Sequence, residues 1–350
     1  MSKLVPFVKL KDASTYRACR WDMRTDHESR EYWVAFFKKH VHTILNLGFE
    51  MAIARNQPAE PVRERMAACV KAFNARFDAF NANPQYDKPV TILTLDEWRD
   101  GLIREHGFVD PFEDLKNREN AGVIGLLPKV CRQHDAMEGT ELFQAVVEGV
   151  FAGNIFDMGA AGSAQLLLDG KLDFFETRKK LPARPWLVDS FDAFADKAKV
   201  GWKKAVFFVD NAGSDFVLGA VPMMRYLARR GAKVVLACNE RPTLNDMTFY
   251  DVQNWWPKIL EAEPSIAELP IQIVSTGTSE PLIDLLAVSP ELNDAAADAD
   301  LVIMEGMGRG VESNLDADFA CDAANLAMIK DHIVAKRLNG KLYDVVCRFR

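Results

Sequence analysis

Acidic and amide side chains follow two apolar segments in the second half of the chain. Asp210 and Asn211 come directly after the apolar run 205–209, and Asp246 lies in the polar loop after 233–238. Two carboxylates and an amide oxygen are hard donors, which suit Mg²⁺ or Mn²⁺ better than zinc or copper. Such a site leaves positions for a phosphoryl oxygen and a water, as metal-assisted phosphate hydrolysis requires. The structural alternative is that Asp210 and Asn211 form an Asx-turn and that Asn245 or Asp246 caps the next helix.

Two further polar loops contain glycine. The segment 275–281, Ser-Thr-Gly-Thr-Ser-Glu-Pro, precedes a predicted helix, so backbone amides around Gly277 either cradle a phosphate or form an ordinary helix cap. The segment 305–310, Glu-Gly-Met-Gly-Arg-Gly, follows another apolar run, and Arg309 there either pairs with an oxyanion or is a surface side chain at a tight turn. Position 311 is Val, so the dinucleotide-binding glycine pattern is not met.

Short apolar runs and amphipathic helices alternate from residue 204 onward, which indicates a parallel sheet. Strands are predicted at 205–209, 233–238, 271–274, 301–304 and 342–349, with helices over 214–230 and 318–338, the second of which carries Lys330. Because the strands are apolar on both faces and are joined by helices, the sheet should be mostly parallel and covered on both sides. Ligands of such sheets bind at the carboxyl ends of the strands, where all of these polar loops fall.

The first half of the chain has a helical pattern. Apolar positions recur at helical spacing over 31–82, near residue 95 and over 140–151, and no strand is predicted before residue 185. We therefore predict an α/β fold, with a Rossmann-like, mostly parallel sheet and an N-terminal helical lobe. The predicted division is a lobe at 1–150 and a core at 151–350, packed as one compact unit because nothing resembles a linker.

Composition limits the partners. The chain has 350 residues, 49% of them hydrophobic, and a net charge of −7 without a long Lys/Arg cluster, which argues against nucleic acid. No apolar run approaches the roughly 20 residues that span a bilayer, and no signal-peptide pattern is present at the N-terminus, so we expect a cytoplasmic protein without a membrane partner. Six cysteines without a C-x-x-C pair predict buried free thiols, and neither zinc nor disulfides.

Several motifs together match a known family. They are Gly153-Asn154-Ile155-Phe156-Asp157, Asp210-Asn211-Ala212-Gly213 with Asp215, Asn239 and Pro242 with Asn245-Asp246 and Thr248, Glu305-Gly306-Met307-Gly308-Arg309-Gly310 with Asn314, and Met328-Ile329-Lys330. In these motifs the chain resembles the metal-dependent damage-control phosphatases, once catalogued as domain of unknown function 89. The resemblance covers roughly residues 140–350 and is nearest to the branch with a stand-alone plant protein and the phosphatase domain of a vertebrate pantothenate kinase homologue.

The resemblance implies roles for particular residues. It implies that Asp210, Asn211 and Asp246 hold the metal, the same three residues that donor chemistry selects. It makes Lys330 a phosphate-binding residue and places Asn154 and Asp157 in the substrate pocket. The implied substrates are small phosphomonoesters, including 4′-phosphopantetheine, its oxidised forms and sugar phosphates. The loop around Gly277 departs from the family pattern, because this chain has Ser-Thr-Gly-Thr where relatives have an Asn-Ser-Gly-Asn type of sequence.

The resulting hypothesis is a phosphatase for small phosphorylated metabolites that uses Mg²⁺ or Mn²⁺, or else Co²⁺ or Ni²⁺. Asp210, Asp246 and Lys330 are its predicted catalytic residues, and Glu305 and Arg309 are predicted to bind substrate. The attacking group is either a water or the carboxylate of Asp210 or Asp246. Two alternatives stay open: a transferase or methyltransferase that binds a nucleotide cofactor, and a regulatory module that keeps the fold without catalysis.

Overall fold

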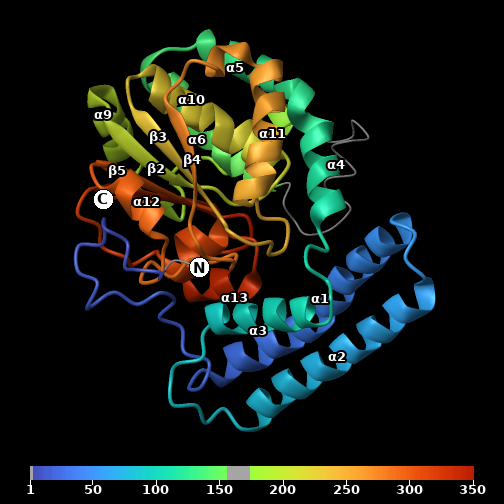
Figure 1. The fold of residues 1–350 in the computed structure, drawn as a ribbon. Helices are drawn as coiled ribbons and strands as arrows, with labels where there is room; N and C mark the ends of the chain where they lie inside the picture. Colours follow the sequence, from blue (N-terminus) through green and yellow to red (C-terminus); the bar gives the residue numbers. More distant parts are fainter. Residues whose placement is uncertain (1–2, 156–173) are drawn as a thin grey trace.

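The computed structural model describes residues 3–155 and 174–350, which form a seven-stranded sheet with helices on both faces and a helical region at one end (Figure 1). The strands are β1 (Val188–Asp189), β2 (Lys204–Phe208), β3 (Lys233–Cys238), β4 (Ile271–Ser275), β5 (Leu301–Glu305), β6 (Asp322–Met328) and β7 (Val345–Phe349). Their order is β1-β7-β6-β5-β2-β3-β4. All neighbouring pairs are parallel except β6 with β7, so the prediction of a mostly parallel sheet is confirmed.

The two faces of the sheet are covered by different elements. Side chains alternate along β2, so that Ala205 and Phe207 join one buried cluster and Val206 and Phe208 join another. The helices of the first face are α5 (Leu127–Asp135), α6 (Gly139–Ile155), α8 (Phe174–Lys179), α9 (Phe191–Val200), α10 (Val221–Arg229) and α11 (Phe249–Ala262). The second face is covered by α12 (Pro290–Ala296) and the N-terminal segment.

Helices α1 (His27–Ala54), α2 (Ala59–Ala82) and α3 (Ile92–Glu105) lie together at one end of the sheet, next to α13 (His332–Arg337) (Figure 1). Aromatic side chains form much of this cluster; the rings of Phe73 and Phe77 stack with centroids 4.4 Å apart. Asp26 caps α1, where its side chain accepts a hydrogen bond from the backbone N–H of Ser29. Helix α4 (Glu113–Val123) connects this region to the helices on the sheet.

The predicted division of the chain at residue 150 stays a prediction. Helices α1–α3 form a buried cluster with α13 and part of β7. Helices α5 and α6, which precede residue 150 in whole or in large part, instead contribute Val130, Phe143 and Phe151 to the cluster on the sheet.

The predicted helix over 318–338 is wrong. Residues Asp322–Met328 form strand β6, and the helix of this region is restricted to α13, so Lys330 lies in the connection between them. The sequence Ala-Ala-Asn-Leu-Ala-Met has high helix propensity, but β6 pairs with both β5 and β7 and is buried on both faces. A strand buried on both faces shows no alternation of polar and apolar residues, so its sequence pattern cannot be distinguished from that of a buried helix.

Two other predicted helix starts differ from the structure. No helix follows Pro281; the next helix is α12, which begins at Pro290 with the hydroxyl of Ser289 as its cap. The helix predicted from Ser214 begins as a π-helical turn over Asp215–Ala220 and continues as α10. Ser214 Oγ donates to the backbone oxygen of Gly153 and so ties this turn to α6.

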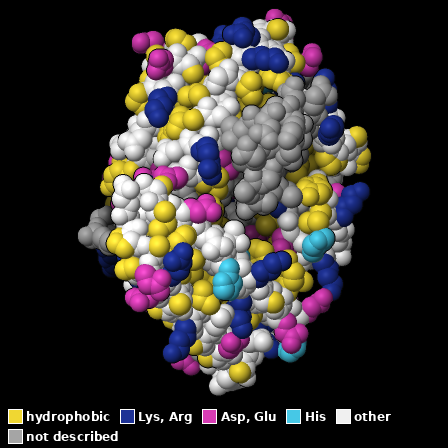
Figure 2. Space-filling view, turned by 90° about the vertical axis from the view of Figure 1, so that its right-hand side faces the viewer, with side chains coloured by type: hydrophobic (Ala, Val, Ile, Leu, Met, Phe, Trp, Pro, Cys, Tyr) yellow, Lys and Arg dark blue, Asp and Glu magenta, His cyan; other side chains and the backbone are white. Residues whose placement is uncertain are grey.

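Charged side chains of both signs lie on the surface (Figure 2), and the cysteines are free thiols. On the face shown in Figure 2, Lys and Arg side chains are interspersed with Asp and Glu side chains. All six cysteines are free, and five of them are buried. Across residues 3–155 and 174–350, none of the helices combines the length and the apolar character needed to cross a bilayer.

Candidate active site

The loops after β2 and β3 lie side by side at the carboxyl ends of the strands. Asn211 and Asp246 pair in an isolated antiparallel bridge. The backbone N–H of Met247 donates to the oxygen of Asp210 at 2.9 Å, and the N–H of Ala212 donates to the oxygen of Asn245, also at 2.9 Å. Backbone hydrogen bonds therefore bring together the three residues that the sequence nominated as metal ligands.

Neither Asn245 nor Asp246 is the N-cap of α11, the helix that follows this loop. The Thr248 hydroxyl accepts from the N–H of Asp251 and so caps α11. Asp246 is 1% exposed and Asp210 is 6% exposed. Because a buried carboxylate is costly unless a cation or hydrogen bonds compensate it, two such groups side by side need a positively charged partner.

Arg309 supplies positive charge to both carboxylates. Its guanidinium donates to Asp210 Oδ1 through one nitrogen and to Asp246 Oδ2 through another. Arg309 is 1% exposed, so the alternative of a surface side chain is excluded. The neighbouring acids raise the pKa of Arg309 against the opposing effect of burial, so the guanidinium is charged. The two carboxylates thus converge on one cation.

Two amides hold the carboxylates from the other side. Asn211 Nδ2 donates to Asp210 Oδ2 at 2.7 Å and to Asp215 Oδ2 at 3.0 Å. Asn154 Nδ2, from the end of α6, donates to Asp215 Oδ2 at 2.8 Å and to Asp210 Oδ2 at 3.3 Å. Because the nitrogen of Asn211 is used in these bonds, its oxygen is the atom available as a metal donor. Asn154, which the resemblance places in the substrate pocket, thus bonds two acids of the site, and its place in the pocket stays a prediction; Asp157 lies outside the described residues.

Glu305 lies behind Asp210 at the end of β5. It is 0% exposed, and its Oε2 accepts from the backbone N–H of Asp210 at 3.2 Å. Burial first, and then the charges of Asp215 and Asp210, raise the pKa of Glu305 well above its usual value. Glycine is required at position 306, where φ is +89° and a Cβ would lie 2.0 Å from Asp210 Oδ2.

A cavity of about 290 Å³ opens over these residues. We call Asp210, Asn211 and Asp246 the floor of the cavity. Arg309 lies beneath the floor and bonds Asp210 and Asp246. We call the lining residues of α1 and α3 the wall of the cavity; they are Trp33, Phe36, Phe37, His40, Ile92, Asp96 and Arg99. The floor is therefore polar, and most of the wall is aromatic.

Lys330 lines the cavity beside Glu312, in the connection after β6. Its backbone N–H donates to Met307 Sδ at 3.3 Å. Burial raises the pKa of Glu312 well above its usual value, with further contributions from the charges of Asp96, Asp331 and Asp210, while Lys330 acts in the opposite direction. The predicted phosphate-binding lysine thus reaches the cavity, although from a loop and not from a helix.

Gly277 is not brought to this site. It does not line the cavity that the described residues form. Its φ is +78°, its N–H donates to Ser275 Oγ at 3.1 Å, and a Cβ there would lie 2.7 Å from Leu4 Cδ2. The structure explains this glycine by a tight turn packed against the N-terminal segment, so the predicted phosphate cradle at Gly277 is not supported by the geometry.

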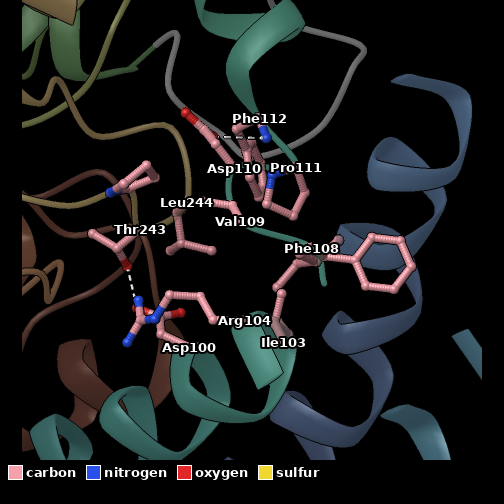
Figure 3. Close-up of a pocket in the computed structure, with 12 residues that line it drawn as sticks. Asp100, Ile103, Arg104, Phe108, Val109, Asp110, Pro111, Phe112, Thr243 and Leu244 are labelled. Atoms are coloured by element: carbon pink, nitrogen blue, oxygen red, sulfur yellow. Dashed lines mark hydrogen bonds between the residues drawn. The ribbon is translucent and has the colours of Figure 1, made fainter. Parts of the chain in front are cut away.

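The wall was not foreseen from the sequence, and neither was the network that fixes it. Arg99 donates to Asp96 and Asp100 through two of its nitrogens, and its third nitrogen donates to the hydroxyl of Thr243 in the loop before Asp246. Thr243 in turn donates to Asp100 Oδ2 at 2.6 Å, and Figure 3 shows this loop lying against α3. The only sequence signal was the spacing of Asp96, Arg99 and Asp100 on a single helical turn.

Burial has opposite effects on two titratable groups of the wall. It raises the pKa of Asp96 to about 7, even though Arg99 lies against it. It lowers the pKa of His40 to about 4, with the charge of Arg99 acting in the same direction. At neutral pH the imidazole of His40 is therefore neutral.

The floor residues fit a divalent metal. The carboxylates of Asp210 and Asp246 already converge on the guanidinium of Arg309. With the amide oxygen of Asn211 beside them, they make the hard donor set that Mg²⁺ or Mn²⁺ prefers. Among the described residues, no three side chains of His, Cys, Asp or Glu group as a metal cluster, so the proposed set depends on Asn211 as its third ligand.

The fold and the position of the site define an α/β protein that binds its ligand at the carboxyl ends of parallel strands. Residues 40–346 match the family model described as the damage-control phosphatase ARMT1-like domain. The chain belongs to this family. The predicted family is thereby confirmed, and with it the class of enzyme, a phosphatase.

Individual relatives agree with the family match. The chain is 35% identical to damage-control phosphatase At2g17340 of Arabidopsis thaliana, covering 99% of this chain and 98% of the relative. It is 28% identical to the 4′-phosphopantetheine phosphatase of Mus musculus, covering 99% of this chain but 48% of the relative. The chain thus spans about half the length of the mouse protein.

A solved structure supports the fold. The crystal structure of a DUF89 family protein from Pyrococcus horikoshii superimposes with a TM-score of 0.65 at 19% identity, covering 90% of this chain and 96% of that chain. At this level of identity the likeness concerns the fold alone.

Proposed function

We propose that the protein is a metal-dependent phosphomonoesterase for small phosphorylated metabolites. The observation that carries the proposal is that Asp210 and Asp246 converge on the guanidinium of Arg309 at the base of a 290 Å³ cavity. A cavity of this size suits a small ester better than a macromolecule. The candidate substrates are 4′-phosphopantetheine, which the name of the mouse relative supports, together with its damaged forms and sugar phosphates.

The proposed metal ligands are Asp210, Asn211 and Asp246. Mg²⁺ or Mn²⁺ is the expected ion, with Co²⁺ or Ni²⁺ as alternatives. When bound, the ion supplies a Lewis acid that polarises a phosphoryl oxygen.

The cationic side chains of the site have separate roles in this proposal. Arg309 is bonded to both carboxylates of the floor and so orients them. Lys330 lines the cavity and would offset the charge of the phosphoryl oxygens that the ion does not polarise. Asn154 and Asn211 hold Asp210 by their amide nitrogens, which keeps the acceptor oxygens in place before substrate binds.

The experiment is phosphate release from a panel that contains 4′-phosphopantetheine and several sugar phosphates. Metal-stripped protein is assayed alone and with Mg²⁺, Mn²⁺, Co²⁺ or Ni²⁺ added back. We expect metal-dependent release that is lost in Asp210→Ala. The control is Asp298→Ala, which removes an exposed carboxylate paired with Lys204 and should leave release unchanged.

The alternatives give different results in the same experiment. A ligand-dependent thermal shift without phosphate release would indicate a non-catalytic module of this fold. The transferase alternative is disfavoured by the family match and by Val311 in place of the third glycine. We also propose a cytoplasmic location, which the six free cysteines support.

A further inference from the structure

The loops that carry the floor residues contact α4 through one buried amide. Asn120, in the last turn of α4, is 0% exposed. Its Oδ1 accepts from the backbone N–H of Gly213 at 2.7 Å, and its Nδ2 lies 3.6 Å from Met247 Sδ, to which it donates. Gly213 is two residues after Asn211, and Met247 is the residue after Asp246. A single side chain therefore bridges the two loops.

The orientation of the Asn120 amide follows from its partners. A backbone N–H can only donate, so the oxygen of Asn120 must face Gly213 and its nitrogen must face the sulfur. Gly213 is buried, and its N–H would otherwise lack a partner at a cost of about 1–3 kcal/mol. Its φ is +75°, and a Cβ there would lie 3.1 Å from Glu119 Cβ, so the loop is fitted closely to α4.

Helix α4 is itself anchored to the start of α11. Lys116, one turn before Asn120, is 1% exposed, and its ammonium bonds Asp110 and Asp251. Asp251 also accepts from the backbone N–H and the hydroxyl of Thr248, which caps α11 two residues after Asp246. The helix that carries Asn120 is thus fixed relative to the second loop by an ion triad.

We propose that Asn120 is a positioning residue that sets the spacing between the Asp210–Asn211 loop and the Asp246 loop for a divalent cation. The inference rests on the proposed metal site. Asn120 touches neither the carboxylates nor the cavity, so it acts through the backbone of the two loops. Loss of a residue that orients metal ligands from behind lowers metal affinity by about 10- to 100-fold.

The test uses full-length, metal-stripped protein and Mn²⁺ alone, with the Kd measured by calorimetry. Asn120→Ala removes both contacts, and we expect its Kd for Mn²⁺ to rise at least about tenfold. Asn120→Asp keeps the acceptor oxygen for Gly213 and should recover part of the affinity. The matched control is Asn117→Ala on the same helix, which removes a 2.9 Å bond from Trp255 Nε1 but does not contact either loop; its Kd should stay within about twofold of the wild type.

Hydrogen exchange supplies a second readout that does not need metal. The N–H of Gly213 should lose protection in Asn120→Ala and keep it in Asn120→Asp and Asn117→Ala. If Asn120→Ala does not fold, Met247→Leu tests the other half of the bridge, because it removes the sulfur acceptor while preserving volume, and its Kd should rise. Wild-type affinity in Asn120→Ala or, failing that variant, in Met247→Leu would overturn the proposal for Asn120 alone; absence of Mn²⁺ binding to the wild type would overturn the metal site itself.

Discussion

The floor and the wall of the cavity are built in different ways. Floor residues lie in the loops after β2 and β3 and are held by backbone hydrogen bonds between these loops, by Arg309 and by the close approach of Gly306. Wall residues are side chains of α1 and α3, placed by the packing of helices in a separate cluster. We therefore propose that the floor acts on the phosphate group, while the wall contacts the rest of the substrate. The kinetic predictions below test that division, and one further prediction concerns stability outside the cavity.

The largest effect is expected in the floor. Asp246→Asn removes a ligand charge with almost no change in shape, so kcat/KM should fall roughly 10³-fold, which corresponds to about 4 kcal/mol of lost transition-state stabilisation. The melting temperature should change little, because Arg309 keeps its bond to Asp210 and Asn239 Nδ2 still has the backbone oxygen of Glu280 as a partner. Steady-state kinetics and thermal unfolding of the same sample measure both.

A large loss of stability with modest loss of turnover would contradict the catalytic role of Asp246. It would mean that this carboxylate serves chiefly to compensate the charge of buried Arg309. The control is Asp100→Asn, in the network behind the wall. It also removes a buried acid that bonds an arginine, here Arg99, but it lies outside the floor.

The next largest effect is expected on the free energy of unfolding, through protonation of a histidine outside the cavity. His134, in α5 on the sheet, is 4% exposed, and burial, with the charges of Arg178 and Arg225 in addition, lowers its pKa to about 4. The unfolded chain binds the proton near pH 6.5, so stability is fully present above that pH and is lost as the pH falls toward 4. The loss from this group amounts to at most about 3 kcal/mol.

The variant His134→Phe isolates that contribution. Its free energy of unfolding, measured in urea at pH 7.5 and at pH 4.5, should fall less with acid than that of the wild type. Asp135, which is next in sequence, has a pKa lowered chiefly by its hydrogen bond to Arg225 and is common to both proteins. An equal acid dependence in the two proteins would contradict the burial argument, and His42→Gln, at an exposed position of α1, is the control.

The smallest effect is expected in the wall. Phe36 is 39% exposed and lines the cavity, so Phe36→Ala should raise KM for an elongated ester such as 4′-phosphopantetheine by about tenfold, or about 1.4 kcal/mol, with kcat nearly unchanged. This contact is the same in the ground state and the transition state, whereas a metal ligand acts on the reacting group. The KM for a small sugar phosphate should change less.

A matched control exists on the same helix. Ile53 is also 39% exposed on α1, but it does not line the cavity, so Ile53→Ala should leave both kinetic constants unchanged. A fall in kcat for Phe36→Ala with every substrate would mean that the wall takes part in the chemistry and would break the division proposed here.

The sequence predicted the floor because its residues are local to strands. The runs at 205–209, 233–238, 271–274 and 301–304 are short, mostly apolar and contain β-branched residues, and the structure has β2, β3, β4 and β5 there. The polar residues after β2 and β3 had to meet, because neighbouring parallel strands end at the same edge of a sheet. Arg309 was foreseen as an anion partner but not as the group that bonds both acids.

The remaining features depend on tertiary packing. Strand β6 has an alanine-rich sequence of high helix propensity, and only its pairing with β5 and β7 makes it a strand. The wall is made of helices that lie far before the floor in the sequence, and no local pattern encodes which face of α1 turns toward the sheet. Asn120 is one buried polar residue in an otherwise ordinary helix pattern, so its contacts become evident only when both loops are in place.

The most direct test of the account is a crystal of the metal-stripped protein soaked in Mn²⁺, with an anomalous difference map. We predict a single strong peak in the cavity, coordinated by carboxylate oxygens of Asp210 and Asp246 and by the amide oxygen of Asn211. A map without a peak there, or with the peak coordinated by other residues, would contradict the central claim that these strand-end residues form the metal site of the phosphatase.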